Sequence, residues 1–493
     1  MGLFAEALQI VLRPSALLAN AFGVAVGIVA GAIPGVNASM AMALILPFTW
    51  SMDVVHSLLM LAGVYCGGQF GGSITAVLVG VPGTTSAAAT VMDGYPMHKK
   101  GQSGKALGMA LIASTIGGFV SAAVLIALAI PLAKVALAFG PAEYFGLAAL
   151  GLTLIAFLSA QDVYKGLLSG LFGLLLSTVG IDPFAGVSRF SFGISNLAGG
   201  LDMIPVMMGL YAVSEVLEEI EKRTLRQRID IRASTELPTA NEVVRLLPLM
   251  IVCSLIGCWV GLMPGAGASI ACWIAYNYAR TVSKNGHLFG TGVIEGVASA
   301  ECANNGVTGG AMVPLLALGI PGSNSTAVML GALVLHGINP GPLVFRDTPL
   351  IPYSIFVGLF VANAFMFLFG LLLVKPSIKF VNAPESVLYS GILALVFTGA
   401  YTLTNDPWPI IVTLFFGVIG YFLRKHGFQP PAIVLGLVLG TIFETSLRRS
   451  LTLSNGSWSI FMTRPIAAVL STATILSMVF FFGKRYLPKK SRA

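Results

Sequence analysis

Four Pro-Gly pairs lie inside or beside apolar segments of this chain, and polar side chains follow two of them directly. Proline removes an amide donor and ends or kinks a helix, so each pair predicts a break at which a new helix begins. Hydroxyl and amide groups at such a break can bind a carboxylate, or replace the water around Na⁺, without burying a fixed charge. The predicted breaks or hairpin tips are Pro34-Gly35, Pro82-Gly83, Pro264-Gly265 and Pro321-Gly322. The predicted substrate-binding residues are Thr84, Thr85, Ser86, Ser323, Asn324, Ser325 and Thr326.

Acidic residues within apolar segments are the second group that could do chemistry, because carboxylates are rare there and usually functional. Glu301 stands one helical turn before Asn304 and Asn305, and Asp93 precedes a Gly-Tyr-Pro sequence. We predict these four residues as candidates for binding a coupling ion, Na⁺ or H⁺. Structural interpretations stay open: Glu301 could cap a helix, Asp93 could begin a turn, and hydroxyl clusters could bond back to the backbone. The sequence predicts neither a cofactor nor a bound metal.

The polar clusters belong to an internal repeat. Gly27, Gly31, Pro34, Gly35 and Ser39 recur 230 residues later as Gly257, Gly261, Pro264, Gly265 and Ser269. The Gly-Val-Pro-Gly sequence at 80–83 likewise recurs as Gly-Ile-Pro-Gly at 319–322. Matching order and spacing indicate a duplicated chain, which is typical of secondary transporters. The glycine rows mostly predict close helix packing rather than ligand binding.

The elements that position these residues must be membrane helices. Only 10 % of the 493 residues are charged, against about 25 % in a soluble domain, and 56 % are hydrophobic. This composition excludes a soluble enzyme and a disordered chain. We predict an all-α polytopic membrane protein with roughly 10–14 spanning or re-entrant segments. Among them are segments near 106–131, 141–160, 163–180, 203–218, 353–374, 386–402 and 407–423.

Basic residues predict how these segments are oriented. They gather at Lys99 to Lys105, in the loop at 221–245 and in the tail after Lys484, and such residues favour the cytoplasm. Counting segments from these positions places the loops after the two hairpin tips on opposite sides, which predicts an inverted repeat. The predicted regions are a first half at 1–220, a basic cytoplasmic loop at 221–245, a second half at 246–420, and C-terminal helices at 421–493 with a cytoplasmic C-terminus.

Motifs for other classes of protein are missing from the sequence. It contains no HExxH, GxSxG or Walker lysine motif, so we expect no enzyme and no direct use of ATP. Its basic residues do not form a face with interleaved aromatic residues, so nucleic-acid binding is not expected. The five cysteines stand in apolar surroundings without a CxxC pair and predict buried side chains. A cleaved signal peptide is not expected, because the first apolar segment lacks a basic start and carries part of the repeat.

Several longer motifs make the chain resemble the large membrane subunit of the bacterial tripartite tricarboxylate transporters. They are DGYPM at 93–97, GPAEYF at 140–145, RF at 189–190, EGVA at 295–298, NN at 304–305, GIPG at 319–322 and GINPGP at 337–342. The resemblance covers nearly the whole chain. It implies a secondary importer of small carboxylates in the bacterial inner membrane, working with a small membrane subunit and a periplasmic solute-binding protein. An anion channel or ion-independent pore, and a structural membrane scaffold, remain the alternatives.

Overall fold

The computed structural model describes residues 2–33, 35–158, 163–222, 236–265, 267–381 and 384–483. Within them the chain forms two compact units, each assembled from separate parts of the sequence. Unit 1 contains residues 1–134 and 207–421, and unit 2 contains residues 135–206 and 422–493. The two units are defined by which residues pack together and not by the repeat. The predicted division of the sequence into two halves therefore stays a prediction.

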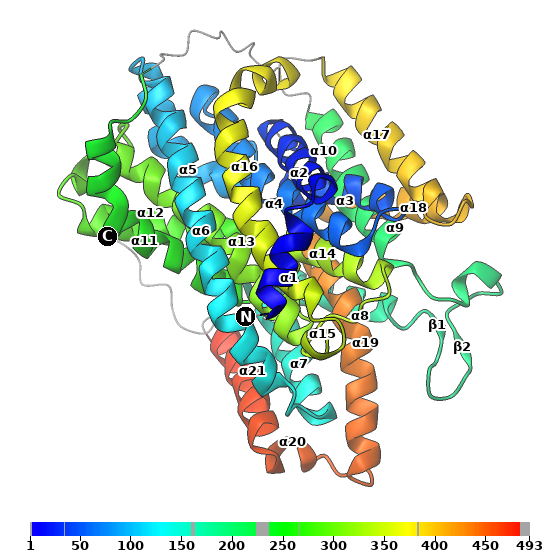
Figure 1. Ribbon diagram of the computed structural model, residues 1–493. Coiled ribbons are helices and arrows are strands. Elements are labelled where there is room, and N and C mark those ends of the chain that lie inside the picture. The colour runs from blue at the N-terminus through cyan, green and yellow to red at the C-terminus, as the bar shows by residue number, and fades with distance from the viewer. Residues whose placement is uncertain are drawn as a thin grey trace. The chain divides into compact units, whose positions relative to one another are not determined.

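Unit 1 is built from helices (Figure 1). Its first part contains α1 (Gly2–Val11), α2 (Pro14–Ala32), α3 (Ala38–Ile45), η1 (Leu46–Thr49), α4 (Val54–Leu78), η2 (Thr85–Ala87), α5 (Ala88–Lys99) and most of α6 (Ser103–Ala136). Its second part contains the π-helix η4 (Met208–Val213), α10 (Ser214–Lys222), α11 (Ala240–Leu262), α12 (Gly267–Val282), η5 (Gly286–Leu288), α13 (Ile294–Leu318), α14 (Asn324–Leu335), α15 (Val344–Asp347), α16 (Leu350–Val381), α17 (Glu385–Thr402) and most of α18 (Trp408–Lys425).

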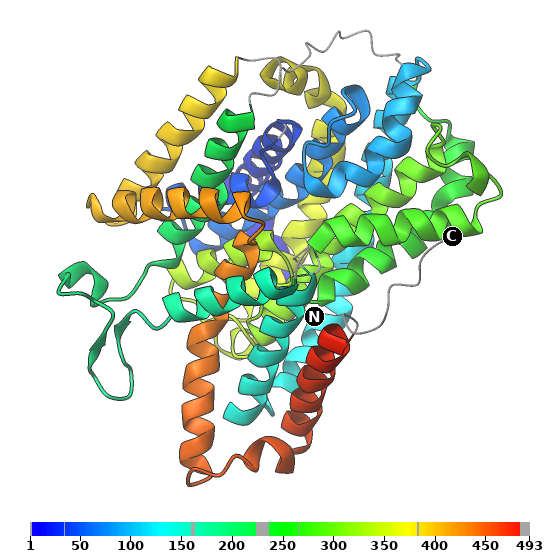
Figure 2. The same cartoon turned by 180° about the vertical axis from the view of Figure 1, so that it is seen from behind.

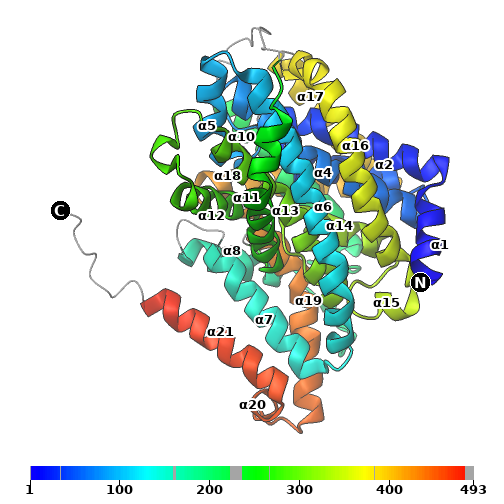
Figure 3. The same ribbon diagram turned by 60° about the vertical axis from the view of Figure 1, so that its left-hand side comes forward.

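Unit 2 consists of helices and one short hairpin. It contains α7 (Pro141–Leu158), α8 (Val163–Leu176), the antiparallel strands β1 (Gly180–Ile181) and β2 (Ser188–Arg189), η3 (Ser195–Leu197), α9 (Met203–Met207, whose last residue belongs to unit 1), α19 (Pro430–Leu453), α20 (Ile460–Thr463) and α21 (Pro465–Gly483). Helix α7 packs against α19 and α21 (Figure 3).

The helices confirm the predicted all-α polytopic membrane fold. In the described parts of the chain, seven helices are long and apolar enough to cross a membrane, and further apolar helices of 10–17 residues accompany them. The predicted segments near 106–131 and 353–374 fall inside α6 and α16, and the segment near 407–423 matches α18 except for its first residue. The predicted segment at 203–218 is divided into α9, η4 and α10, because a π-helical turn interrupts its α-helical hydrogen bonding.

Glycine rows bring two helix pairs into close contact in unit 1. A Cβ atom added to Gly27 of α2 would lie 2.5 Å from the Val64 carbonyl oxygen of α4. A Cβ atom added to Gly257 of α11 would lie 2.3 Å from the Ala303 carbonyl oxygen of α13. The equivalent glycines therefore make equivalent contacts, as close packing of membrane helices requires. In Figure 2, seen from behind, α11 and α12 are adjacent green helices.

Ion pairs fasten the loops of unit 2 to its helices. Arg189 of the hairpin donates to Glu444 of α19 at 2.7 Å, and Arg448 of α19 donates to Asp182 at 2.8 Å. The Phe184 backbone N–H and the Arg448 guanidinium hold the pKa of the Asp182 carboxyl below its ordinary value. Arg464, just before α21, donates to Glu143 of α7 at 2.7 Å. These contacts bind segments more than 250 residues apart into one unit.

Candidate functional site

A polar pocket of about 100 Å³ lies inside unit 1, where the helix breaks of both repeats meet. Each break contributes a short run of residues, and α4 adds one side chain from its middle. The lining residues are Asn37, Ala38, Ser39, Gln69, Thr84, Thr85, Ser86, Gly267, Ala268, Ser269, Ser323, Asn324 and Ser325. All of these are uncharged, so the pocket presents hydroxyl and amide groups without a fixed charge.

Helix N-termini point their partial positive charge at this pocket. Helices α3, α12 and α14 begin at Ala38, Gly267 and Asn324, and each of these residues lines it. The N-terminus of a helix carries roughly half an elementary positive charge and unpaired N–H groups. Glycine is needed at the first break of each repeat, because Gly35 and Gly265 adopt positive φ angles of 86° and 78°. The local sequence thus ends one helix and starts another where the pocket forms.

Hydrogen bonds join the two repeats across the pocket. The Ser269 hydroxyl donates to Thr85 Oγ1 at 2.9 Å, and the Tyr65 and Ser323 hydroxyls lie 3.1 Å apart. Within the first repeat, the hydroxyls of Thr84 and Ser86 lie 3.0 Å apart, and Ser86 donates to Gln69 Oε1 at 3.3 Å. The polar groups are therefore fixed in position before any ligand binds.

The structure brings most of the predicted substrate-binding residues together. Thr84, Thr85, Ser86, Ser323, Asn324 and Ser325 all line the pocket. Thr326 does not: its side chain and that of Ser323 form a capping box at the start of α14. The tips at Pro82-Gly83 and Pro321-Gly322 lie between helices, as do Gly35 and Pro264-Gly265. Pro34 lies outside the described residues.

The pocket also contains polar residues that the sequence interpretation did not select. Ser39 and Ser269 occupy equivalent positions in the repeat, Asn37 caps α3, and Gln69 lies in the middle of α4. The two serines carried a signal, because a hydroxyl residue recurs at the same distance after each first Pro-Gly pair. Gln69 carried no local signal, since only the packing of α4 brings it to the pocket.

Asp93 is fully buried, does not line the pocket, and has a complete set of hydrogen-bond donors. It accepts a hydrogen bond from the Tyr276 hydroxyl at 2.8 Å. The backbone N–H groups of Gly290, Gly292 and Val293 donate to its other oxygen at 2.8–3.0 Å. This carboxylate thus holds the loop before α13 against α5 and α12.

The other predicted ion-binding residues lie on α13. Glu301, Asn304 and Asn305 are all fully buried, and Asn304 donates to the Gln69 backbone carbonyl at 3.1 Å. Because Gln69 lines the pocket, Asn304 is separated from the pocket by this one residue. Glu301 accepts hydrogen bonds from Thr90 and Ser114.

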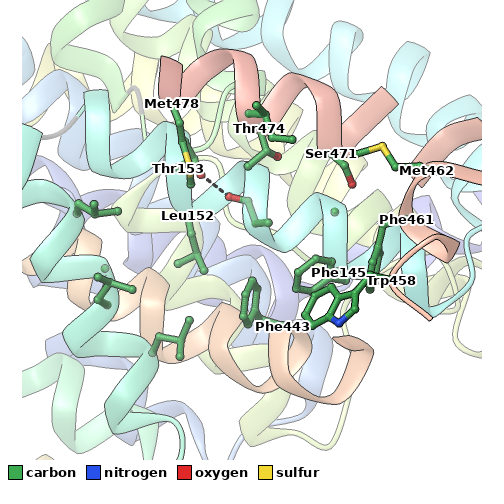
Figure 4. A pocket seen from close by; sticks show the side chains of 17 residues that line it. Phe145, Leu152, Thr153, Phe443, Trp458, Phe461, Met462, Ser471, Thr474 and Met478 are labelled. Carbon is green, nitrogen blue, oxygen red and sulfur yellow. Dashed lines mark hydrogen bonds between the residues drawn. The ribbon is translucent and has the colours of Figure 1, made fainter. Parts of the chain in front are cut away.

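A second, larger cavity of about 620 Å³ lies within unit 2 and has a different chemistry. The rings of Phe145, Phe443, Trp458 and Phe461 line it, together with aliphatic side chains of α7, α8 and α21 (Figure 4). Its few hydroxyl groups include that of Thr153, which donates to the Ala149 carbonyl oxygen. Such apolar walls do not favour a carboxylate, so the smaller polar pocket is the candidate substrate site.

A many-helix membrane protein whose helix breaks meet at a polar pocket belongs to the class of membrane transporters. Residues 17–435 match the family described as the tripartite tricarboxylate transporter TctA family. The chain belongs to this family.

Two curated relatives come from Agrobacterium vitis. The "uncharacterized 52.8 kDa protein in TAR-I ttuC' 3'region" is 35 % identical over 458 residues, which is 93 % of this chain and 91 % of the relative. The "uncharacterized protein in TAR-II ttuC' 3'region" is 36 % identical over 214 residues, which is 43 % of this chain and 88 % of the relative. No solved structure matches the chain significantly.

Proposed function

We propose that this chain is the permease subunit of an importer for tricarboxylates or other small carboxylates. The observation that carries the proposal is the uncharged pocket at which three helix N-termini meet hydroxyl and amide groups. Helix N-termini attract an anion, and the hydroxyl and amide groups can donate hydrogen bonds to it. An importer must also release its substrate, which favours such donors over a bidentate arginine that would bind the anion more tightly.

The pocket of about 100 Å³ is smaller than the roughly 300–1,000 Å³ of a site that encloses a drug-sized ligand. A tricarboxylate would therefore require the pocket to widen. Movement of one repeat against the other would open the pocket to one side and then to the other, as alternating access requires.

We further propose that import takes place across the bacterial inner membrane and is driven by a Na⁺ or H⁺ gradient. The tripartite family implies a small membrane subunit and a periplasmic binding protein as partners. In this scheme the binding protein captures the carboxylate and delivers it to the polar pocket. The basic residues of the loop and of the tail favour a cytoplasmic C-terminus by the positive-inside rule.

Uptake into proteoliposomes tests the proposal. The permease is reconstituted with its small membrane subunit, and the binding protein and labelled citrate are added outside. We expect labelled citrate to accumulate above its outside concentration while an ion gradient exists, and accumulation to collapse when ionophores remove that gradient. Downhill flux that continues unchanged without any gradient would instead identify a channel or pore.

A further inference from the structure

Glu301 is the one fully buried carboxyl group described here that accepts hydrogen bonds only from neutral side chains, with no backbone N–H and no cationic side chain among its donors. It lies on α13 with no exposed surface. One of its oxygens accepts from the Thr90 hydroxyl of α5, and the other accepts from the Ser114 hydroxyl of α6 at 3.0 Å. Three helices thus enclose it.

The charge of this carboxylate lacks compensation, in contrast to the other buried carboxyl groups described. Glu143 pairs with Arg464, Glu295 pairs with Arg245, and Asp182 pairs with Arg448. Asp93 has no cationic partner but accepts from three backbone N–H groups and a tyrosine. No lysine, arginine or histidine of the described segments forms an ion pair with Glu301. An isolated buried carboxylate is strongly unfavourable, so a cation must accompany it or a proton must neutralise it.

Unpaired polar atoms next to Glu301 point to such a cation. Ser73 and Asn304 are further polar neighbours of the carboxyl group. Within the described structure, Asn304 Oδ1 is buried and has no hydrogen-bond partner, and Ser73 Oγ has none apart from the Glu301 carboxyl group. Both side-chain polar atoms of the adjacent Asn305 are also unpaired. Buried polar atoms are nearly always satisfied, and oxygen atoms are the ligands that hard cations prefer.

The cluster is connected to the substrate pocket through Gln69. Asn304 donates to the Gln69 backbone carbonyl at 3.1 Å, and the Gln69 side chain accepts from Ser86 of the pocket at 3.3 Å. A change in charge at Glu301 can therefore alter the position of a pocket group through a short chain of contacts. Two sites that affect each other in this way are coupled, and the coupling acts in both directions.

We propose that Glu301, with Ser73, Thr90, Ser114 and Asn304 around it, holds the coupling cation directly behind the carboxylate pocket. The cation is either a proton on the Glu301 carboxyl group or a Na⁺ ion among the surrounding oxygens. This inference rests on the proposed importer function and deepens it by assigning one residue to coupling. The inference gives no coupling role to Asp93, because hydrogen-bond donors already satisfy the Asp93 carboxylate.

The test compares the wild type with Glu301→Gln in the complete reconstituted system, under a pH gradient alone and under a Na⁺ gradient alone. If H⁺ is the coupling ion, the wild type responds to the pH gradient, whereas Glu301→Gln loses accumulation but still exchanges labelled for unlabelled citrate. If Na⁺ is the coupling ion, the wild type responds to the Na⁺ gradient. The half-saturating Na⁺ concentration of the variant then rises roughly tenfold or more, as expected for a lost contact to a charged group. Accumulation by Glu301→Gln with unchanged ion dependence would overturn the inference.

Two further variants guard against a merely structural effect. Ser114→Ala keeps the carboxyl group and removes one of its donors, so the half-saturating ion concentration should shift in the same direction as in Glu301→Gln and by less. Asp93→Asn should reduce the yield of folded protein and leave the ion dependence of the surviving protein unchanged. If Glu301→Gln does not fold, an unchanged ion dependence in Ser114→Ala overturns the inference. Failure of the wild type to accumulate citrate under either gradient would instead overturn the proposed function.

Discussion

Side chains at the start of α14 should control substrate affinity. Asn324 and Ser325 line the pocket at the N-terminus of this helix. A hydrogen bond to a charged group contributes about 1.5–3 kcal/mol, so Asn324→Ala and Ser325→Ala should each weaken apparent affinity by roughly 10- to 150-fold. The half-saturation constant, obtained from initial uptake rates over a range of citrate concentrations, measures this apparent affinity.

A matched control for these variants is Asn277→Ala, on the exposed side of α12 and away from the pocket lining. It should transport like the wild type. Thr84→Ala and Thr85→Ala should weaken affinity as the α14 variants do, since both residues line the same pocket. Normal uptake by Asn324→Ala at citrate concentrations below the wild-type half-saturation constant would show that the start of α14 does not bind the substrate.

The two repeated serines provide a second test at the scale of single residues. Ser39 and Ser269 are equivalent in the repeat and both line the pocket. Ser269 also donates to Thr85, whereas Ser39 donates to Asn37 within its own segment. Ser269→Ala should therefore impair uptake more than Ser39→Ala, because it also breaks a contact between the repeats. Half-saturation constants of the two single variants and of the double variant measure the difference, and equal effects would contradict it.

At the scale of helices, the packing glycines should govern folding rather than substrate affinity. A methyl group on Gly27 or Gly257 would overlap a backbone carbonyl of the facing helix. Overpacking typically costs about 1–3 kcal/mol, so Gly27→Ala and Gly257→Ala should lower the fraction of monodisperse protein after detergent extraction and its melting temperature. Gly391→Ala on α17 is the control, since nothing lies within 4 Å of an added Cβ atom there. Unchanged melting temperatures in both packing variants would show that the helices separate easily.

The sequence predicted helices well because the signals for them are local. Apolar length places α6, α16 and α18, and Pro-Gly pairs mark the breaks that bring Thr84 and Ser323 to the pocket lining. Contacts between distant helices carry no such local signal. Gln69 stands in the middle of α4 and reaches the pocket only through tertiary packing. For the same reason, the sequence did not indicate that residues 135–206 and 422–493 form one unit.

At the scale of the whole molecule, the inverted repeat can be tested by its topology. Lys100, beyond the end of α5, is expected in the cytoplasm, and Asp347, at the end of α15, is expected outside. Both residues are exposed, and all five native cysteines are buried, so single cysteines introduced at these positions can be labelled selectively. A membrane-impermeant maleimide should label Asp347→Cys in intact spheroplasts and label Lys100→Cys only after permeabilisation.

Leu237→Cys lies in the exposed segment before α11, which is also expected in the cytoplasm, and should behave like Lys100→Cys. The labelling pattern also tests whether the two repeats are inverted or parallel. Inversion would explain why the breaks of both repeats meet at one pocket, since antiparallel repeats can bring equivalent helix starts together near the middle of the membrane. If Lys100→Cys and Asp347→Cys were labelled from the same side, the repeats would be parallel. Transport through the pocket would then require a mechanism other than the movement of two inverted halves about a fixed site.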